Sequence, residues 1–489
     1  MLNDRGDMAE GNVGSPDMTA AEFREHGRAV IDRIADYLAH PENVAVLPDI
    51  QPGDVASALP TEAPERPEPF ERILDDYDRL IVPGTTHWNH PGFFAYFAIT
   101  GSAPGILGEA LAAALNVNAM LWRTGPAQTE LEAVTLDWLR QLLGLPEGFH
   151  GVINDTASSS TLYALAAARE AAGLDVRARG LAGRGDLPRL RVYCSEEAHS
   201  SVDKAVITLG LGAENVVRIP TDEEFRMVPE ILRRAVRQDV ARGYRPLAVV
   251  ATVGTTGVTA VDPVPEIAEV CRQERLWLHV DAAYGGTAAI MPEMRHVLAG
   301  CERADSLVVN PHKWMFVPID CSAAYTRHPD VMRQAFSLTP EYLKTGADAT
   351  NLMDFGVSLG RRFRALKLWF VLRYFGRSGI ADALREHCRL ARLFAGWVDA
   401  DDRFTRVAPV PFSVVTFRAA SSGLSDEEAD AYNQRVLEWV NGSGEVFLSH
   451  TRVRGRFVLR LAVGNLRTRE THVARAWDLL REAAEAERP

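Results

Sequence analysis

The stretch PLAVVATVGTTGVTAVDPVPEIAEVCRQERLWLHVDAA, residues 246–283, decides the fold class. Apolar runs at 246–253 and 276–283 are each long enough for a buried strand, and apolar residues at helical spacing lie between them at 264–274. Strands that are apolar on both faces are typical of a parallel sheet covered by helices on both sides. The stretch therefore predicts a strand–helix–strand unit of an α/β domain.

The same alternation continues on both sides of this unit. Further strand-like runs are expected at 190–195, 216–220 and 305–309. An amphipathic helix is expected at 228–243. After residue 369 the pattern changes. Amphipathic helices are expected at 376–399 and 425–441, and strands at 413–419 and 456–463. The sequence thus predicts a large α/β domain followed by a smaller α+β domain.

The amino-terminal part is expected to be separate from these two domains. Thr19-Ala-Ala-Glu22 has the spacing of a capping box and predicts the start of a helix. We expect four parts in all. These are a disordered leader (1–17), an N-terminal helical segment (18–102), a large cofactor-binding domain (103–368) and a small C-terminal α+β domain (369–489).

Composition bounds the classes of function. The chain has 489 residues, 47% of them hydrophobic, and a net charge of −12, which argues against general affinity for nucleic acid or anionic membranes. Its five cysteines are scattered without CxxC spacing, which is typical of reduced thiols. We therefore expect a soluble, cytoplasmic protein that binds neither nucleic acid nor membrane and holds no structural metal.

Chemically useful side chains follow four of the expected strands. Ligands of α/β sheets bind at the carboxyl ends of the strands. At those ends the sequence has the carboxylate of Asp281, the amine of Lys313 in Asn310-Pro-His-Lys313, the hydroxyls of Thr255-Thr256 and the imidazole of His199. Lys313 lies in the apolar stretch LVVNPHKWMF (307–316), where a charged ammonium is costly to desolvate. We interpret it as an amine that acts in its neutral form.

A fifth element is GVINDTASSSTLYALAAARE at 151–170. Small hydroxyl residues precede an alanine-rich helix, whose free N–H groups can bind a phosphate. Alone, this pattern is more typical of an ordinary helix cap. The sequence has no G-x-G-x-x-G after a strand, no P-loop and no H-E-x-x-H, which disfavours nicotinamide, nucleotide-hydrolysing and zinc-protease functions.

What remains fits pyridoxal phosphate, whose chemistry uses each of these groups. A lysine holds the aldehyde as an imine, a carboxylate keeps the pyridine nitrogen protonated, and an imidazole can lie on the ring. A helix start can bind the phosphate.

Six motifs carry a resemblance to a known family: HVDAAYGG, NPHKW, EEAHSSV, ATVGTT, THWNHPGFFAYF and LGRRFRALKLWFV. Together they resemble the group II pyridoxal-phosphate decarboxylases, specifically the aromatic-L-amino-acid decarboxylase branch. The resemblance runs from about Thr19 to about Arg481. It implies the type I fold of pyridoxal-phosphate-dependent transferases, with a mostly parallel seven-stranded sheet, and a carboxy-lyase activity. It also implies a homodimer whose active sites are shared, with the N-terminal segment packing on the partner.

The resemblance implies four catalytic residues. Lys313 is the expected Schiff-base lysine and Asp281 the partner of the pyridine nitrogen. His199 is expected to stack on the ring and face the substrate carboxylate. Tyr342, in SLTPEYLKTG, matches the loop tyrosine that returns a proton to Cα after carbon dioxide leaves.

The resemblance also implies residues that bind the cofactor and the substrate. Cofactor contacts beyond those of Lys313, Asp281 and His199 are expected from Thr156, Ala157, Ser158, Thr256, Ala283, Asn310 and His312. Substrate contacts are expected from Trp88, Tyr96, Phe97, Ile99 and Gly360, as well as His199.

The sequence departs from the family after Tyr96-Phe97, where aromatic decarboxylases usually carry proline and a hydroxyl residue. Ile99 cannot hydrogen-bond a ring hydroxyl, and a buried hydroxyl without a partner loses on the order of 1–3 kcal/mol. This favours phenylalanine or tryptophan over tyrosine or DOPA. Gly360, where some phenol-preferring relatives carry serine, leaves room for an indole. The loop between Lys344 and Leu359 is a few residues shorter than in animal members.

Alternative functions stay open at this point. A non-aromatic amino acid such as glutamate is an alternative substrate. Decarboxylation with deamination to an aldehyde is an alternative reaction, although Tyr342 and His199 favour amine release. A non-catalytic cofactor-binding scaffold predicts the loss of Lys313 or Asp281, and both are present.

Overall fold

A computed structural model of the chain describes residues 17–338, 350–420 and 423–487. These residues form two compact units, which divide between His87 and Trp88. The boundary lies inside the N-terminal segment expected at 18–102. All of the expected leader except Asp17 lies outside the described residues. Within the described ranges, no helix has the length and apolarity needed to cross a membrane.

The first unit is helical. It contains α1 (Ala20–Ala39), α2 (Asp54–Ala58) and α3 (Phe70–Asp76), followed by a π-helical turn at Tyr77–Ile81. The expected capping box is confirmed, because the Thr19 hydroxyl accepts from the Glu22 N–H at 3.3 Å and the Glu22 carboxylate accepts from the Thr19 N–H at 2.8 Å. No side chain of α1 is buried, and Phe23 is 67% exposed.

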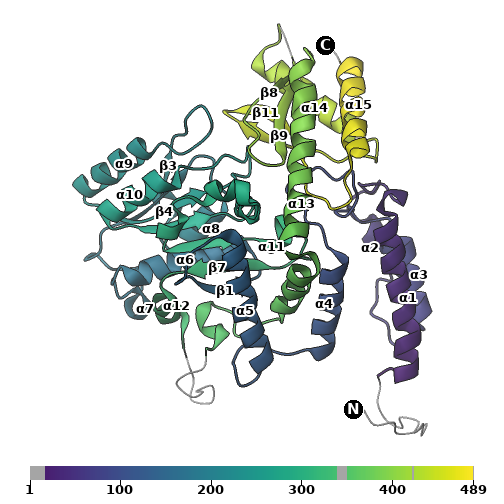
Figure 1. Cartoon of the computed structure of the whole chain (residues 1–489), viewed down its shortest axis with the longest axis horizontal. Coiled ribbons are helices and arrows are strands. Elements are labelled where there is room, and N and C mark those ends of the chain that lie inside the picture. Colours follow the sequence, from purple (N-terminus) through teal and green to yellow (C-terminus); the bar gives the residue numbers. More distant parts are fainter. Residues whose placement is uncertain (1–16, 339–349, 421–422, 488–489) are drawn as a thin grey trace. The chain divides into compact units, whose positions relative to one another are not determined.

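The second unit is built on a seven-stranded sheet of order β1-β7-β6-β5-β4-β2-β3 (Figure 1). The strands are His150–Asn154, Leu190–Ser195, Val216–Ile219, Arg245–Thr252, Trp277–Asp281, Ser306–Val309 and Ser322–Thr326, β1 to β7 in chain order. The five strands β2 to β6 pair in parallel, and β7 pairs antiparallel with both β6 and β1. The expected fold class, a mostly parallel sheet, is confirmed.

Helices cover both faces of this sheet because both faces are apolar. On β4, Val249 contributes to one buried cluster with residues of α9 and α10, and Val250 to the opposite cluster with residues of α6 and α8. The helices of this domain are α4 to α12, at Ala103–Leu115, Pro126–Leu143, Ala157–Ala171, Val176–Arg179, Ser201–Thr208, Pro229–Ala241, Val264–Glu274, Pro311–Trp314 and Pro329–Phe336.

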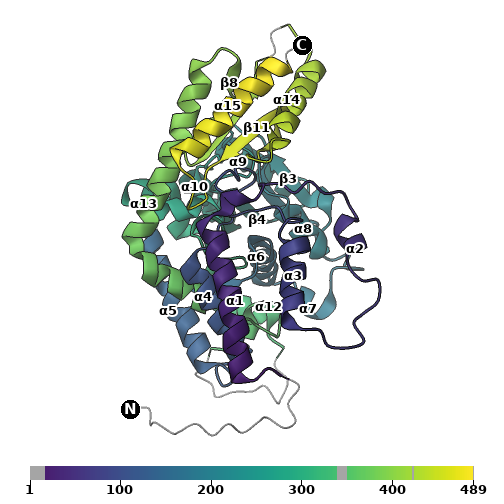
Figure 2. The same cartoon turned by 90° about the vertical axis from the view of Figure 1, so that its right-hand side faces the viewer.

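The small domain has an antiparallel sheet of order β10-β11-β9-β8. Its strands β8 to β11 are Phe404–Arg406, Val414–Ala419, Ser449–Val453 and Arg456–Ala462. Helices α14 (Asp426–Asn441) and α15 (Glu470–Ala486) lie side by side (Figures 1 and 2). Their apolar side chains share one buried cluster with those of the sheet.

The long helix α13 (Arg364–Ala400) passes from α4 in the large domain to the small sheet (Figure 1). It crosses the boundary expected at 368/369 and changes direction at Gly376, whose φ of 59° is rarely adopted by other residues. Close packing of α4 on α13 depends on Gly108, because a Cβ there would lie 2.9 Å from the Lys367 Cα. One kinked helix therefore connects the two sheets of the second unit.

Candidate active site

Lys313 lies at the carboxyl end of a central strand. Strand β6 ends at Val309, and Asn310 begins the one-turn helix α11 that carries the lysine. The Asn310 N–H donates to the Ala283 carbonyl at 3.0 Å, and the Ala283 N–H donates to the Asp281 carboxylate at 3.1 Å. These bonds tie the ends of β5 and β6 together, and so bring Asp281 and Lys313 to one edge of the sheet.

The Lys313 ammonium is desolvated although part of the residue stays accessible. Desolvation lowers its pKa, the Asp281 carboxylate opposes that shift, and the Arg460 guanidinium adds to it. The Nζ atom lies 5.0 Å from the centre of the Phe97 ring. This environment favours the neutral amine, the form that can attack a carbonyl.

His199 follows β2, in the turn before α8. Its Nδ1 accepts from the Ser201 N–H at 3.1 Å, so the neutral ring carries its proton on Nε2. Desolvation lowers the pKa of His199, while the Asp281 carboxylate raises it and the Lys313 ammonium lowers it. The three strand-end residues expected to act together are thus close enough to interact electrostatically.

Helix α6 packs against β5 and β6, with Thr156 as its N-cap. The Thr156 hydroxyl accepts from the Ser159 N–H at 3.4 Å. The preceding N–H groups, of Ala157 and Ser158, belong to the first turn of the helix and have no intrahelical acceptor. This end of α6 is therefore suited to an anion beside the strands that carry Asp281 and Lys313.

The remaining expected cofactor residues occupy neighbouring loops. Thr256 is exposed after β4, whereas Thr255 is buried and its hydroxyl accepts from the Ala260 N–H at 3.0 Å. His312 Nδ1 accepts from the Cys321 N–H at 2.8 Å, and desolvation lowers the pKa of His312 to about 4. His312 therefore anchors α11 to the start of β7 as a neutral ring.

The aromatic segment, residues 88–99 and most of the motif THWNHPGFFAYF, lies beside the lysine. Phe97 is buried and stacks on Tyr284 with ring centres 4.0 Å apart, and its ring faces Lys313. Tyr96 is 53% exposed and stacks on Trp88 at 5.7 Å. Phe97 is thus the residue of this segment that forms a wall of the site.

No hydrogen bond or ring contact among the described residues joins Ile99 or Gly360 to Lys313, Asp281 or His199. Ile99 is half-buried in the same segment. Gly360 is exposed, and a Cβ there would meet the Asn118 side chain at 3.8 Å, an ordinary contact. Tyr342 lies outside the described residues.

Arg460 is a residue of this site that the sequence patterns do not predict. It lies in β11, is 3% exposed, and donates to the Gly257 carbonyl at 2.9 Å and to the Ser449 hydroxyl at 3.1 Å. Its guanidinium carbon lies 5.5 Å from the centre of the Phe97 ring, on which Lys313 also lies. No described carboxylate pairs with it, and its second terminal nitrogen is buried without a partner. The signal was an arginine within the apolar strand RFVLRLAV.

Arg361 and Glu132 form a buried ion pair that the sequence patterns do not predict. Their side chains are 8% and 4% exposed. Arg361 donates to Glu132 at 2.9 Å and to the Ile153 carbonyl at 2.6 Å, and the Ile153 N–H donates to Glu132 at 2.8 Å. The pair thus hydrogen-bonds both the backbone N–H and the carbonyl of Ile153 in β1, the strand that leads to α6. The basic run GRRFRALK gave a signal, but its partner could not be read from the sequence.

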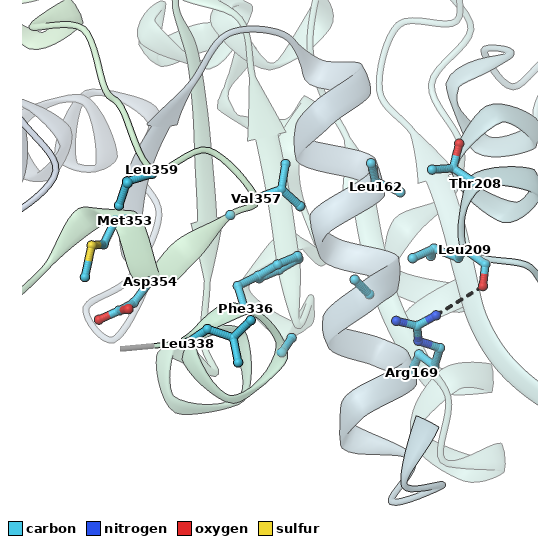
Figure 3. A pocket seen from close by; sticks show the side chains of 13 residues that line it. Leu162, Arg169, Thr208, Leu209, Phe336, Leu338, Met353, Asp354, Val357 and Leu359 are labelled. Atoms are coloured by element: carbon cyan, nitrogen blue, oxygen red, sulfur yellow. Dashed lines mark hydrogen bonds between the residues drawn. The ribbon is translucent and has the colours of Figure 1, made fainter. Parts of the chain in front are cut away.

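A separate hollow of about 540 Å³ lies beside α6 (Figure 3). It is lined mainly by apolar side chains, and Arg169 donates there to the Leu209 carbonyl at 3.1 Å. None of the residues expected to bind cofactor or substrate lines it. The hollow is therefore distinct from the site around Lys313.

The residues around Lys313 fit pyridoxal phosphate. The site offers a desolvated amine, a buried carboxylate at Asp281 and a helix N-terminus at α6. The Asn310 side-chain oxygen is buried with no partner in the protein and can accept a bond from a bound group. Each group needed to hold an aldehyde, a pyridine nitrogen and a phosphate is thus present.

Comparison with known proteins agrees with this reading. Residues 52–420 match the family described as the pyridoxal-dependent decarboxylase conserved domain. The chain is 42% identical to tryptophan decarboxylase TDC2 of Camptotheca acuminata over 95% of both chains, and 40% identical to phenylacetaldehyde synthase of Arabidopsis thaliana over 97% and 98%. A crystal structure of Oryza sativa TDC with PLP and tryptamine superposes with a TM-score of 0.92 and 38% identity, covering 96% of this chain and 99% of that one.

The match covers most of the chain and the identity extends over nearly all of it, so the family predicted from the six motifs is confirmed. The chain belongs to the pyridoxal-phosphate-dependent decarboxylases, in the branch of the aromatic-L-amino-acid decarboxylases, and pyridoxal phosphate is its cofactor.

Proposed function

We propose that the protein converts an aromatic L-amino acid to the corresponding arylalkylamine and carbon dioxide. The observation that carries this proposal is the desolvated Lys313 amine beside Asp281, against the face of Phe97. An aromatic wall at the amine suits an aromatic side chain. Relatives that act on tryptophan and tyrosine add support.

The residues of the site would hold the cofactor in one orientation. Lys313 would bind its aldehyde, the N-terminus of α6 with Thr156, Ala157 and Ser158 its phosphate, and Asp281 its ring nitrogen. Pyridoxal phosphate, when bound, accepts the electron pair released from the bond between Cα and the carboxylate. Asp281 favours that release by keeping a proton on the ring nitrogen.

Two cationic or proton-bearing groups can meet the substrate carboxylate. His199 carries its proton on Nε2, because its Nδ1 accepts from Ser201. Arg460 has a buried nitrogen without a partner, and a carboxylate would satisfy it. Holding the carboxylate in one direction selects the bond that breaks, which is the contribution of positioning to the rate.

The fate of Cα decides between amine and aldehyde. Tyr342 remains the predicted acid that returns a proton to Cα, and general acid catalysis of this kind contributes roughly 10²–10⁴-fold. We expect Tyr342→Phe to lower amine formation and raise the fraction of aldehyde and ammonia, with dissolved dioxygen as the oxidant that is reduced to peroxide. Equal amine yields from Tyr342→Phe and the unchanged protein would show that another group delivers the proton.

The substrate ring is expected to lack a hydroxyl. Ile99 offers no hydrogen bond to one, and a Cβ at Gly360 would meet only the Asn118 side chain, at 3.8 Å. We therefore infer a preference for tryptophan or phenylalanine over tyrosine or DOPA. One observation favours a different class, since the unpaired Arg460 could instead bind the side-chain carboxylate of glutamate.

The experiment is a substrate panel. The purified protein, loaded with pyridoxal phosphate, is incubated with each aromatic L-amino acid and with glutamate, and carbon dioxide, amine and peroxide are followed together. We expect amine equal to carbon dioxide, little peroxide, and the highest kcat/KM with tryptophan or phenylalanine. Turnover of glutamate alone would contradict the aromatic assignment, and stoichiometric peroxide would contradict amine release.

We also propose that the protein is a homodimer. Helix α1 buries none of its side chains within its own unit. On α4, the residues Leu107, Leu111 and Leu115 follow one another at helical spacing and are 49%, 52% and 58% exposed. Apolar faces of this kind mark interfaces. A second copy would cover them, as the family resemblance implies.

We expect Leu111→Glu to convert a dimer into a monomer, because an unpaired carboxylate is costly to bury in an interface. Analytical ultracentrifugation gives the mass of each variant. Val240→Glu is the matched control, since Val240 is 56% exposed on another helix, α9, and should leave the mass unchanged. A monomeric unchanged protein, or a dimeric Leu111→Glu variant, would contradict the proposal.

The cytoplasm is the proposed location. All five cysteines are free and buried, and burial raises the pKa values of their thiols. Thiols held in this form suit a reducing compartment.

A further inference from the structure

The residue after the lysine is held by a buried histidine. Trp314 Nε1–H donates to His387 Nδ1 at 3.0 Å, and His387 Nε2 lies 3.1 Å from the Asn465 carbonyl oxygen. An indole nitrogen can only donate, so His387 Nδ1 must accept and Nε2 must carry the proton that goes to Asn465. Both ring nitrogens are thus used, and the ring orientation is fixed.

The histidine is neutral in this position. His387 is 2% exposed, and desolvation lowers its pKa to about 4. Protonation of Nδ1 would place two donors, the indole and the imidazolium, against each other. The contact therefore requires the neutral ring, which burial maintains.

Further hydrogen bonds connect Asn465 to the aromatic segment. The Asn465 side-chain amide donates to the carbonyl oxygens of His90 at 3.0 Å and Trp88 at 3.3 Å. Its own side-chain oxygen accepts from the Arg467 N–H at 2.8 Å. His387 on α13 thereby connects the helix that carries the cofactor lysine to the start of the segment that lines the substrate side.

A column of stacked rings makes the same connection a second time. Trp314 stacks on Tyr284 with ring centres 4.8 Å apart and planes 16° apart, and Tyr284 stacks on Phe97 at 4.0 Å and 18°. Phe97 is the ring that faces the Lys313 amine. A rotation of Trp314 would therefore disturb Phe97 as well as the backbone of Lys313.

The lysine depends on such anchors because α11 is only four residues long. A helix of one turn has little stability of its own. The two neighbours of Lys313 are held by different elements, His312 by the Cys321 N–H before β7 and Trp314 by His387 on α13. Loss of either anchor would leave the lysine free to shift.

Resting on the proposed decarboxylation, we propose that His387 is a positioning residue. It holds Trp314 and the Asn465 carbonyl together, and thereby fixes Lys313 relative to Phe97 and the aromatic segment at 88–99. Both of its ring nitrogens bind protein groups, so it acts through Trp314 and Asn465.

The test compares two substitutions of the same residue in the cofactor-loaded protein. His387→Phe removes both hydrogen bonds, and we expect kcat to fall roughly 10- to 100-fold with a smaller change in KM, because misplacement of a reacting group acts mainly on turnover. The absorbance spectrum of the bound cofactor should change as well, since it reports the surroundings of Lys313. His387→Gln retains an acceptor and a donor, and should restore both kcat and the spectrum to near their original values.

The control is Tyr432→Phe. The Tyr432 hydroxyl donates to the Ala484 carbonyl at 2.9 Å within the small domain, so this variant also loses a buried bond to a carbonyl group. We expect it to lower the melting temperature while leaving kcat unchanged. Where His387→Phe does not fold, His387→Asn replaces it, because the shorter amide can meet Trp314 but not reach the Asn465 carbonyl, and the same fall in kcat is expected.

Three results would overturn the positioning role. These are a normal kcat in His387→Phe, an impairment of His387→Gln as large as that of His387→Phe, and an equal loss of kcat in Tyr432→Phe. Failure of the unchanged protein to release amine would instead overturn the proposed function. The two failures are therefore distinguishable.

Discussion

Lys313→Ala should abolish turnover and the covalent attachment of the cofactor. We expect kcat to fall roughly 10⁴-fold or more, since effects of this size follow removal of an enzyme's nucleophile. The reason is specific to the site: the pKa of Lys313 is lowered by desolvation, so the unprotonated amine is available at a lower pH than for an ordinary lysine. Capture of the cofactor aldehyde by the free amine should therefore persist to a lower pH than with an ordinary lysine, and be lost as the pH falls below the pKa of Lys313.

The measurement uses the small number of lysines. The chain has four, namely Lys204, Lys313, Lys344 and Lys367. Reduction of the loaded protein with borohydride should fix the cofactor covalently, and peptide mass mapping should find it on the Lys313 peptide. Lys367 is fully buried against Glu109 at 2.8 Å, and Lys204 is exposed on α8, so Lys204→Arg is the matched control. Attachment at any other lysine, or full turnover by Lys313→Ala, would contradict the role of Lys313.

Local sequence patterns predicted much of this fold because they report on near neighbours. The run LRVYCS forms β2 over the same residues, 190–195, and the Thr19 capping box has the expected bonds. Strands β1 and β7 were not recognised individually. Their residues, HGVIN and SAAYT, are short and rich in small side chains, and they join the sheet only through antiparallel pairing with each other and with β6.

The site was predicted unevenly for the same reason. Lys313 and Asp281 stand at strand ends, where the order of elements alone brings them together. Arg460 comes from β11 of the small domain and His387 from α13, and both meet the lysine environment through tertiary packing. No local pattern encodes a contact between residues so far apart, although an arginine inside an apolar strand is a signal that can be looked for. The catalytic and binding roles of Lys313, Asp281 and His199 remain predictions, as do those of Tyr342 and Gly360.

Arg460→Gln should selectively weaken the use of substrates that carry a carboxylate. The guanidinium is almost fully buried, it has one nitrogen without a partner, and desolvation lowers its pKa to about 10. A buried cation of this kind needs an anion, and the substrate carboxylate is the anion that enters the site. Truncating one side of a buried charge pair costs about 2–5 kcal/mol, so we expect kcat/KM to fall on the order of 10²- to 10³-fold.

The control separates carboxylate binding from support of Phe97 and the loop at Gly257. The arylalkylamine product lacks a carboxylate, so its inhibition constant should be nearly equal in Arg460→Gln and in the unchanged protein. Arg460→Lys retains the charge but not the planar fork, and should lie between the two in kcat/KM. If Arg460 only stabilises the packing of β11, inhibition by the amine and kcat/KM will weaken together. A glutamate-specific loss, with aromatic substrates unaffected, would assign the guanidinium to a side-chain carboxylate and so revise the substrate class.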